Sequence, residues 1–239
     1  LFILEANPRA SRTMPFVSKV TGNQIIKAGT LLMLGHSLDS IKKTTNYLNS
    51  STNKVAIKKA IFPWSRFPAE DTMLGPEMKA TGEVLGIGRS FGVALNKAYA
   101  AAGVEINENE KGIFVSLSDQ EKPNFIKIVK TYSDLGFKIY STYGTGEYLK
   151  NNEINSTIVG RADETFPTSL TILQDKLISL VINTPTFANE YTDGWKIRRL
   201  SHETGVAVVS SVREAEAFLK AFLETTKSFE DMEAIQNVS

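Results

Sequence analysis

The strongest constraint on the fold is an alternation of short apolar runs with amphipathic segments in the second half of this 239-residue chain. The apolar runs, each about the length of one strand, lie at residues 112–117, 138–141, 157–160, 177–183 and 206–210. Between them, apolar residues recur at helical spacing, as in 123–135, where Phe125, Ile128 and Val129 share a face. The pattern predicts an α/β fold whose five-stranded parallel sheet has helices on both faces.

Polar side chains gather at the ends of these predicted strands. In parallel sheets, ligands bind beyond the carboxyl ends of the strands, at the point where the strand order reverses. The hydroxyls, amide and cations at those ends belong to Ser116, Ser118, Lys122, Thr142, Thr145, Arg161, Asn183 and Thr184. Such groups suit a phosphate or a carboxylate. Only Asp119 and Asp163 lie nearby as possible general bases, so we expect binding without chemistry.

The segment 138–146, KIYSTYGTG, predicts one part of this site in more detail. An apolar strand runs into a turn with two threonines and two glycines, and a helix is expected over 147–152. Backbone N–H groups and hydroxyls in such a turn can surround an anion. An ordinary strand-to-helix turn remains the alternative interpretation.

The first half of the chain predicts a smaller α+β unit. We expect a buried strand at Leu1–Leu4, a helical segment at 17–34, a polar loop at 44–54, strands at 55–62 and 83–88, and a helix at 91–102 capped by Ser90. The chain opens on the apolar run without a preceding turn, so we expect this strand to belong to a larger unit.

Four residues after the first predicted strand could serve phosphate chemistry. Glu5 and Asn7 fall on one face of an extended segment, and their oxygens are hard ligands suited to magnesium. Arg9 and Arg12 follow within reach of phosphoryl oxygens. A solvated strand end is the alternative.

Composition excludes several functions. A net charge of +1 gives no electrostatic case for nucleic acid or an anionic membrane. Without cysteine there are no disulfides or thiolate metal sites, and His36 and His202 are too far apart in sequence to suggest zinc. No stretch reads as a signal peptide or membrane span, so we expect a cytoplasmic protein.

Two long strings resemble the end of an ATP-grasp domain in the carbamoyl phosphate synthetase large subunit. They are EANPRASRTMPFVSKVTG at 5–22 and FPAEDTMLGPEMKATGEVLGIGR at 67–89. The resemblance implies that residues 1–104 are the C-terminal remnant of that domain. It also implies that Glu5 and Asn7 are metal ligands, and that Arg9 and Arg12 line the phosphoryl-transfer site. ATP with magnesium or manganese would be the cofactors of the intact parent, and none would be tightly held by the fragment.

Residues 105–239 resemble the methylglyoxal-synthase-like allosteric domain of the same subunit. The matching strings are KGIFVSLS, STYGTG, LVINTP and KIRR. In nucleotide-regulated members, the resemblance implies an effector site at Lys122, Thr142, Thr145, Arg161, Asn183 and Thr184. Here Arg161 replaces a lysine, Tyr143 a histidine and Pro185 a hydroxyl residue, which leaves open whether UMP, IMP, N-acetylglutamate or no effector binds.

The parent implied by this resemblance is a ligase that makes carbamoyl phosphate for arginine or pyrimidine synthesis. It uses ATP, bicarbonate and ammonia, the last delivered by a glutaminase small subunit. The fragment would retain effector binding without synthetase turnover. Alternatives are a stand-alone small-molecule-binding regulator or a methylglyoxal-synthase-like lyase, but the Gly-Gly-Asp motif that the lyase needs is absent.

Overall fold

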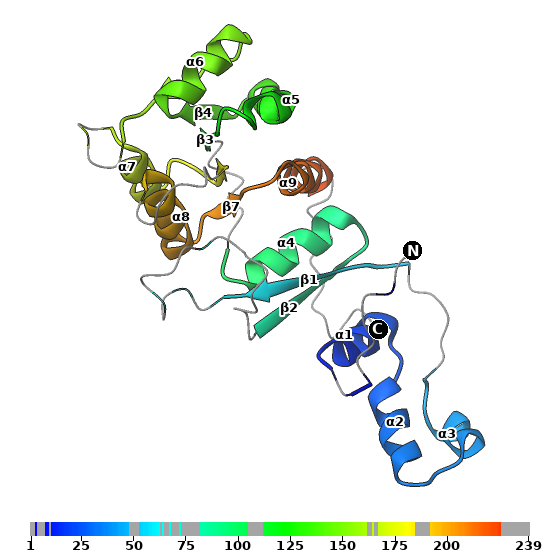
Figure 1. The fold of residues 1–239 in the computed structure, drawn as a ribbon. Helices are drawn as coiled ribbons and strands as arrows, with labels where there is room; N and C mark the ends of the chain where they lie inside the picture. The colour runs from blue at the N-terminus through cyan, green and yellow to red at the C-terminus, as the bar shows by residue number, and fades with distance from the viewer. Residues whose placement is uncertain are drawn as a thin grey trace.

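The computed structural model describes residues 3, 8–9, 11–47, 53–62, 64, 67, 72, 82–104, 112–161, 164, 167–184 and 192–225. Its architecture is α/β, with a parallel sheet in the second half of the chain and an antiparallel strand pair in the first (Figure 1). Both parts have the fold class that the sequence predicts.

The parallel sheet consists of β3 (Gly112–Ser116), β4 (Lys138–Ser141), β5 (Thr157–Ile158), β6 (Leu180–Asn183) and β7 (Ala207–Val209). Their spatial order is β5-β4-β3-β6-β7, and every neighbouring pair is parallel. The chain therefore adds β4 and β5 on one side of β3, and then β6 and β7 on the other. The strand order reverses at the carboxyl end of β3, which is where such sheets bind ligands.

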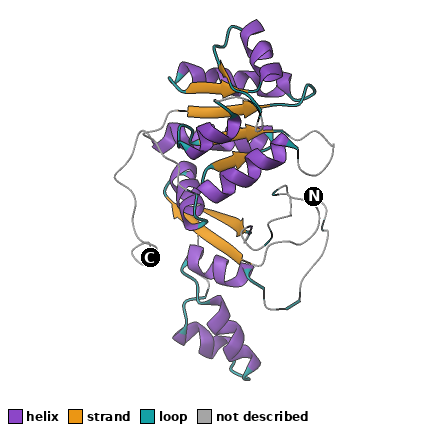
Figure 2. Ribbon diagram, turned by 90° about the vertical axis from the view of Figure 1, so that its left-hand side faces the viewer, coloured by secondary structure: helices purple, strands orange, loops and turns teal. Residues whose placement is uncertain are grey.

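Helices cover both faces of this sheet, as predicted (Figure 2). They are α5 (Lys122–Asp134), α6 (Tyr143–Asn151), α7 (Ser169–Gln174), α8 (Asp193–Thr204) and α9 (Val212–Thr225). On one face, Ile113 and Val115 of β3 belong to a cluster with α5 and α9 residues, among them Phe125. On the other, Phe114 joins residues of α7 and α8, among them Ile197. Successive β3 side chains thus enter opposite cores, which explains why this strand is apolar throughout.

The first part contains α1 (Thr13–Thr21), α2 (Ile25–Met33), α3 (Leu38–Thr44), the antiparallel strands β1 (Val55–Ile61) and β2 (Gly82–Gly88), and α4 (Phe91–Ala101). The Ser90 hydroxyl accepts a hydrogen bond from Val93 N at 3.3 Å, which confirms the predicted cap. Helix α4 lies against β2 at a glycine, because a Cβ on Gly86 would collide with the Ala94 carbonyl oxygen. The hairpin and α4 therefore form one packed unit.

Helix α4 also packs on α9, so the two parts of the chain are in direct contact (Figure 1). The Tyr99 ring meets the Phe218 ring edge-on, with centroids 4.6 Å apart. The Gly92 N–H donates to Glu224 Oε2 at 2.7 Å, and a Cβ on Gly92 would stand 2.8 Å from the Ala221 carbonyl oxygen. The predicted division at residue 104 falls between α4 and β3 and stays a prediction.

Three sequence-based expectations differ from the structure. Residues 17–34 form parts of two helices, because α1 ends at Gly22, whose φ of +69° is left-handed. Ile3 is 87% exposed, so the buried strand expected at 1–4 is wrong at that residue. No described strand pairs with it, and an apolar run is buried only where neighbours cover it.

The third difference concerns the glycine-rich segment. Helix α6 begins at Tyr143, four residues before the predicted start, so Gly144 and Gly146 lie in its first turns. Neither glycine has positive φ. Gly146 is required by close packing instead, since a Cβ there would stand 2.7 Å from Ser141 Oγ and 2.8 Å from an Ile158 carbon.

Candidate anion-binding site

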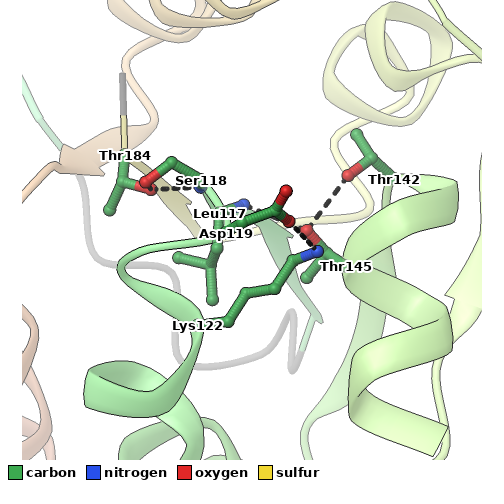
Figure 3. A network of polar contacts seen from close by, with 7 residues as sticks. All are labelled: Leu117, Ser118, Asp119, Lys122, Thr142, Thr145 and Thr184. Carbon is green, nitrogen blue, oxygen red and sulfur yellow. Dashed lines mark hydrogen bonds and ion pairs between the residues drawn. The ribbon is translucent and has the colours of Figure 1, made fainter. Parts of the chain in front are cut away.

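Two threonines from opposite sides of β3 hold the loop that follows this strand (Figure 3). Leu117 N donates to Thr145 Oγ1 at 3.0 Å, and Ser118 N donates to Thr184 Oγ1 at 2.8 Å. Thr145 lies on α6, after β4, whereas Thr184 directly follows β6. The structure therefore brings these predicted site residues together at the point where the strand order reverses.

The hydroxyls at this point are largely engaged with the protein itself. Thr142 Oγ1 donates to Thr145 Oγ1 at 3.2 Å, which places the two predicted threonines in direct contact. Thr145 is only 1% exposed and Thr184 only 6%. Backbone N–H groups that would otherwise be buried without acceptors are satisfied by these oxygens. Thr145 and Thr184 thus shape the loop, and Thr142 is the more accessible hydroxyl.

Lys122, at the start of α5, supplies a cation at the same place. Its Nζ lies 2.6 Å from Asp119 Oδ1, and its side chain is 12% exposed against 94% for the aspartate. The ammonium also lies 5.9 Å from the centre of the Tyr148 ring on α6. The hydrogen bond from Lys122, together with its charge, lowers the pKa of the Asp119 carboxyl below its usual range.

Asn183 is buried beside a buried arginine. Arg198 Nη1 donates to Asn183 Oδ1 at 2.7 Å, and the Asn183 amide donates to the Ser116 carbonyl oxygen at 3.4 Å. Arg198 is 5% exposed and lies one helical turn after Gly194 on α8. A Cβ on Gly194 would stand 3.1 Å from Arg198 Nη1, so the glycine makes room for this contact. Because Arg198 donates to Oδ1, the side-chain nitrogen of Asn183 is the end that points away from Arg198.

Comparisons with known proteins show what the chain is similar to. Residues 124–210 match the family model of the MGS-like domain. The carbamoyl phosphate synthase large chain of Nostoc sp. is 38% identical over 236 residues, 99% of this chain and 21% of the relative. Over nearly its whole length, the chain is similar to the C-terminal part of carbamoyl phosphate synthase large chains. The resemblance expected from the sequence motifs is thereby confirmed.

Two further relatives of this family are themselves C-terminal sections of the large chain. The one from Aquifex aeolicus is 36% identical over 244 residues, 97% of this chain and 45% of the relative. The one from Methanocaldococcus jannaschii is 36% identical over 238 residues, 96% and 38% respectively. The chain therefore spans about a fifth to less than half of the length of these curated large-chain relatives.

Arg161, another predicted effector residue, pairs with the start of α8. It is 74% exposed, and its Nε lies 3.8 Å from Asp193 Oδ2 at the start of α8. Its backbone N–H donates to Glu164 Oε2 at 2.9 Å. Asp193 precedes Gly194, so Arg161 is linked to the Asn183 side of the site rather than to Lys122.

The residues expected at a phosphoryl-transfer site are only partly described. Glu5 and Asn7 lie outside the described residues. Arg9 is exposed, and Arg12 Nε lies 3.7 Å from Glu83 Oε1 on β2, which Lys58 Nζ also approaches, at 3.5 Å. Within the described part of the chain, no group of three His, Cys, Asp or Glu residues could hold a metal ion. No described helix is both long and apolar enough to cross a membrane.

Asp119 and Arg198 are the residues whose importance sequence reasoning missed. The sequence indicates Asp119 only as a nearby base, and it leaves Arg198 open between a solvated helix face and the site. For Arg198 the available signal was Gly194 four residues earlier on the same helical face. For Asp119 it was the three-residue spacing to Lys122.

Proposed function

We propose that this chain is the effector-binding part of a carbamoyl phosphate synthase large chain. It would bind a small molecule that carries a phosphate or a carboxylate, at the carboxyl end of β3. The observation that carries this proposal is the convergence of Thr145 and Thr184 on one loop that also presents the Lys122 ammonium.

The chemistry of this loop favours an anion. Lys122 donates charge-assisted hydrogen bonds, which are about twice as strong as neutral ones. Helix α6 begins at Tyr143, and the first N–H groups of a helix, with the positive end of its dipole, attract negative charge. Gly144 is exposed there, and a Cβ on it would come within 3.7 Å of Lys122 Nζ. A ligand oxygen at Lys122 would thus also lie near the start of α6.

The same proposal assigns the remaining predicted residues. Thr142 would donate its hydroxyl to the anion, whereas Asn183, Thr184 and Arg161 would contact the rest of the effector. In the whole large chain, Glu5 and Asn7 would hold magnesium or manganese with ATP, and Arg9 and Arg12 would approach the transferred phosphoryl group. A glutaminase small subunit would supply ammonia. The present chain would bind effector without making carbamoyl phosphate.

Calorimetric titration of the chain tests the proposal. UMP, IMP, N-acetylglutamate and inorganic phosphate serve as separate titrants, so that phosphate and carboxylate ligands are distinguished. Lys122→Met should weaken binding of the active titrant at least about tenfold, because a hydrogen bond to a charged group is lost. Lys127→Met is the matched control, since Lys127 is exposed on the same helix.

Two outcomes would contradict the proposal. One is the absence of heat from all four titrants with the wild-type chain. The other is an equal loss of affinity in Lys122→Met and Lys127→Met, which would reduce the effect to overall charge. Thr142→Ala adds an independent check, because equal heats from this variant and wild type would remove Thr142 from the site.

A further inference from the structure

The side chains of the ion pair between Asp119 and Lys122 differ greatly in exposure. The two charged atoms are 2.6 Å apart, but the aspartate side chain is 94% exposed while the lysine side chain is 12% exposed. The carboxylate therefore lies on the solvent side of the ammonium, where Figure 3 shows it beside the Thr142–Thr145 pair. An ion pair with so exposed a partner contributes little to folding.

Losing its partner would cost the Lys122 ammonium more free energy than it would cost the Asp119 carboxylate. A largely covered ammonium is costly unless it is paired, whereas the exposed carboxylate can turn into water with little loss. The lysine is held by its surroundings, between the Tyr148 ring and the start of α6. The aspartate, three residues earlier in the loop before α5, is free of such packing. Of the pair, the carboxylate is the exchangeable member.

We propose that Asp119 is an internal counter-ion which the phosphate or carboxylate of the effector displaces from Lys122. This inference rests on the proposed anion site and adds a residue that sets its affinity. A carboxylate tethered three residues away occupies the ammonium as a built-in competitor, so every anionic ligand binds more weakly than the lysine alone would allow. Asp119 also keeps Lys122 paired when no effector is present.

Asp119→Asn tests the inference, because asparagine keeps the shape and removes the competing charge. Calorimetry with inorganic phosphate and with the active effector of the wild-type chain should show binding about twofold to fivefold tighter, the range expected for losing one exposed ion pair. Glu121→Gln is the matched control. It removes the same charge two residues away and keeps an oxygen for the 3.1 Å hydrogen bond from Asn124. At physiological salt its effect should stay within about 1.5-fold.

A second readout follows the displaced carboxylate directly. Carbon-13 NMR of the wild-type chain reports the Asp119 carboxyl titration with and without saturating inorganic sulfate, whose own pKa lies below the usual aspartate range. Displacement removes the Lys122 contact, so the lowered pKa of Asp119 should rise toward the usual aspartate range when sulfate binds. A purely structural pair would keep its low pKa.

The outcomes separate this inference from the proposed function. If Lys122→Met abolishes binding but Asp119→Asn binds no better than wild type, or binds more weakly, the internal counter-ion is wrong and the anion site stands. An Asp119 pKa that stays low with sulfate bound also overturns the inference. If neither wild type nor Asp119→Asn binds any titrant, both the site and the counter-ion are refuted.

Discussion

Replacing Thr145 by valine should destabilise the whole chain, although the threonine lies at a proposed ligand site. Valine keeps the shape and β-branching of threonine but removes the oxygen that accepts from Leu117 N at 3.0 Å. Thr145 is 1% exposed, so water has little access to the N–H that loses its acceptor. The substitution therefore tests whether this hydroxyl first serves the fold.

The expected loss follows from the cost of an unsatisfied buried donor. Such a group costs about 1–3 kcal/mol, and the partly buried Thr142 hydroxyl, which also loses its acceptor, can turn to water. We expect the free energy of unfolding to fall by about 2 kcal/mol. For a chain of this size, that lowers Tm by roughly 4–8 °C.

Urea denaturation followed by circular dichroism measures the change. Thr131→Val is the control, because the Thr131 hydroxyl is exposed and donates within its own helix, to the Lys127 carbonyl oxygen at 2.9 Å. The control should stay within about 0.5 kcal/mol of wild type. A Thr145→Val variant as stable as Thr131→Val would refute the assignment of Thr145 to the loop.

Two further predictions concern the contact between the two parts of the chain. Gly92→Ala should lower the free energy of unfolding by about 1–3 kcal/mol, because the added Cβ would stand 2.8 Å from a carbonyl oxygen of α9. Gly29→Ala should raise the free energy of unfolding by about 0.5–1 kcal/mol, because a Cβ there meets nothing within 4 Å and alanine favours the helix. Thermal unfolding compares the two, and equal effects would contradict close packing of α4 on α9. Burial, with the charges of Lys59 and Arg199, lowers the pKa of His202 to about 4, so the unfolded chain binds the proton more readily. The free energy of unfolding should therefore fall by on the order of 2 kcal/mol, after allowing for partial exposure, as the pH drops from about 6.5 to 4. A His202→Gln chain with the same pH dependence would refute the assignment of this loss to His202.

The sequence predicted the parallel sheet well because its strands enter two cores. Phe114 packs on one face and Val115 on the other, so the run stays apolar and is recognisable without periodicity. The order of the strands in space was not predicted, because it depends on which edge of β3 each crossover reaches. That order is what brings Thr145 and Thr184 to the same loop.

The start of α6 shows why local patterns fail at the site. Two glycines in four residues weaken a helix, so the sequence predicted a turn there. In the structure the segment is helical because Gly146 allows α6 to approach Ser141 and Ile158, a contact that no local pattern encodes. Arg198 is a related case, since a helical arginine usually faces water, whereas here it is buried and donates to Asn183.

The most direct test of the account is a nitrogen-15 NMR titration of the wild-type chain with inorganic phosphate. The account predicts that the largest amide shifts fall on residues 117–122 and 142–146, with Lys122 and Gly144 among them. Shifts concentrated instead in α1–α3, or spread evenly over the surface lysines, would contradict a phosphate site at the carboxyl end of β3.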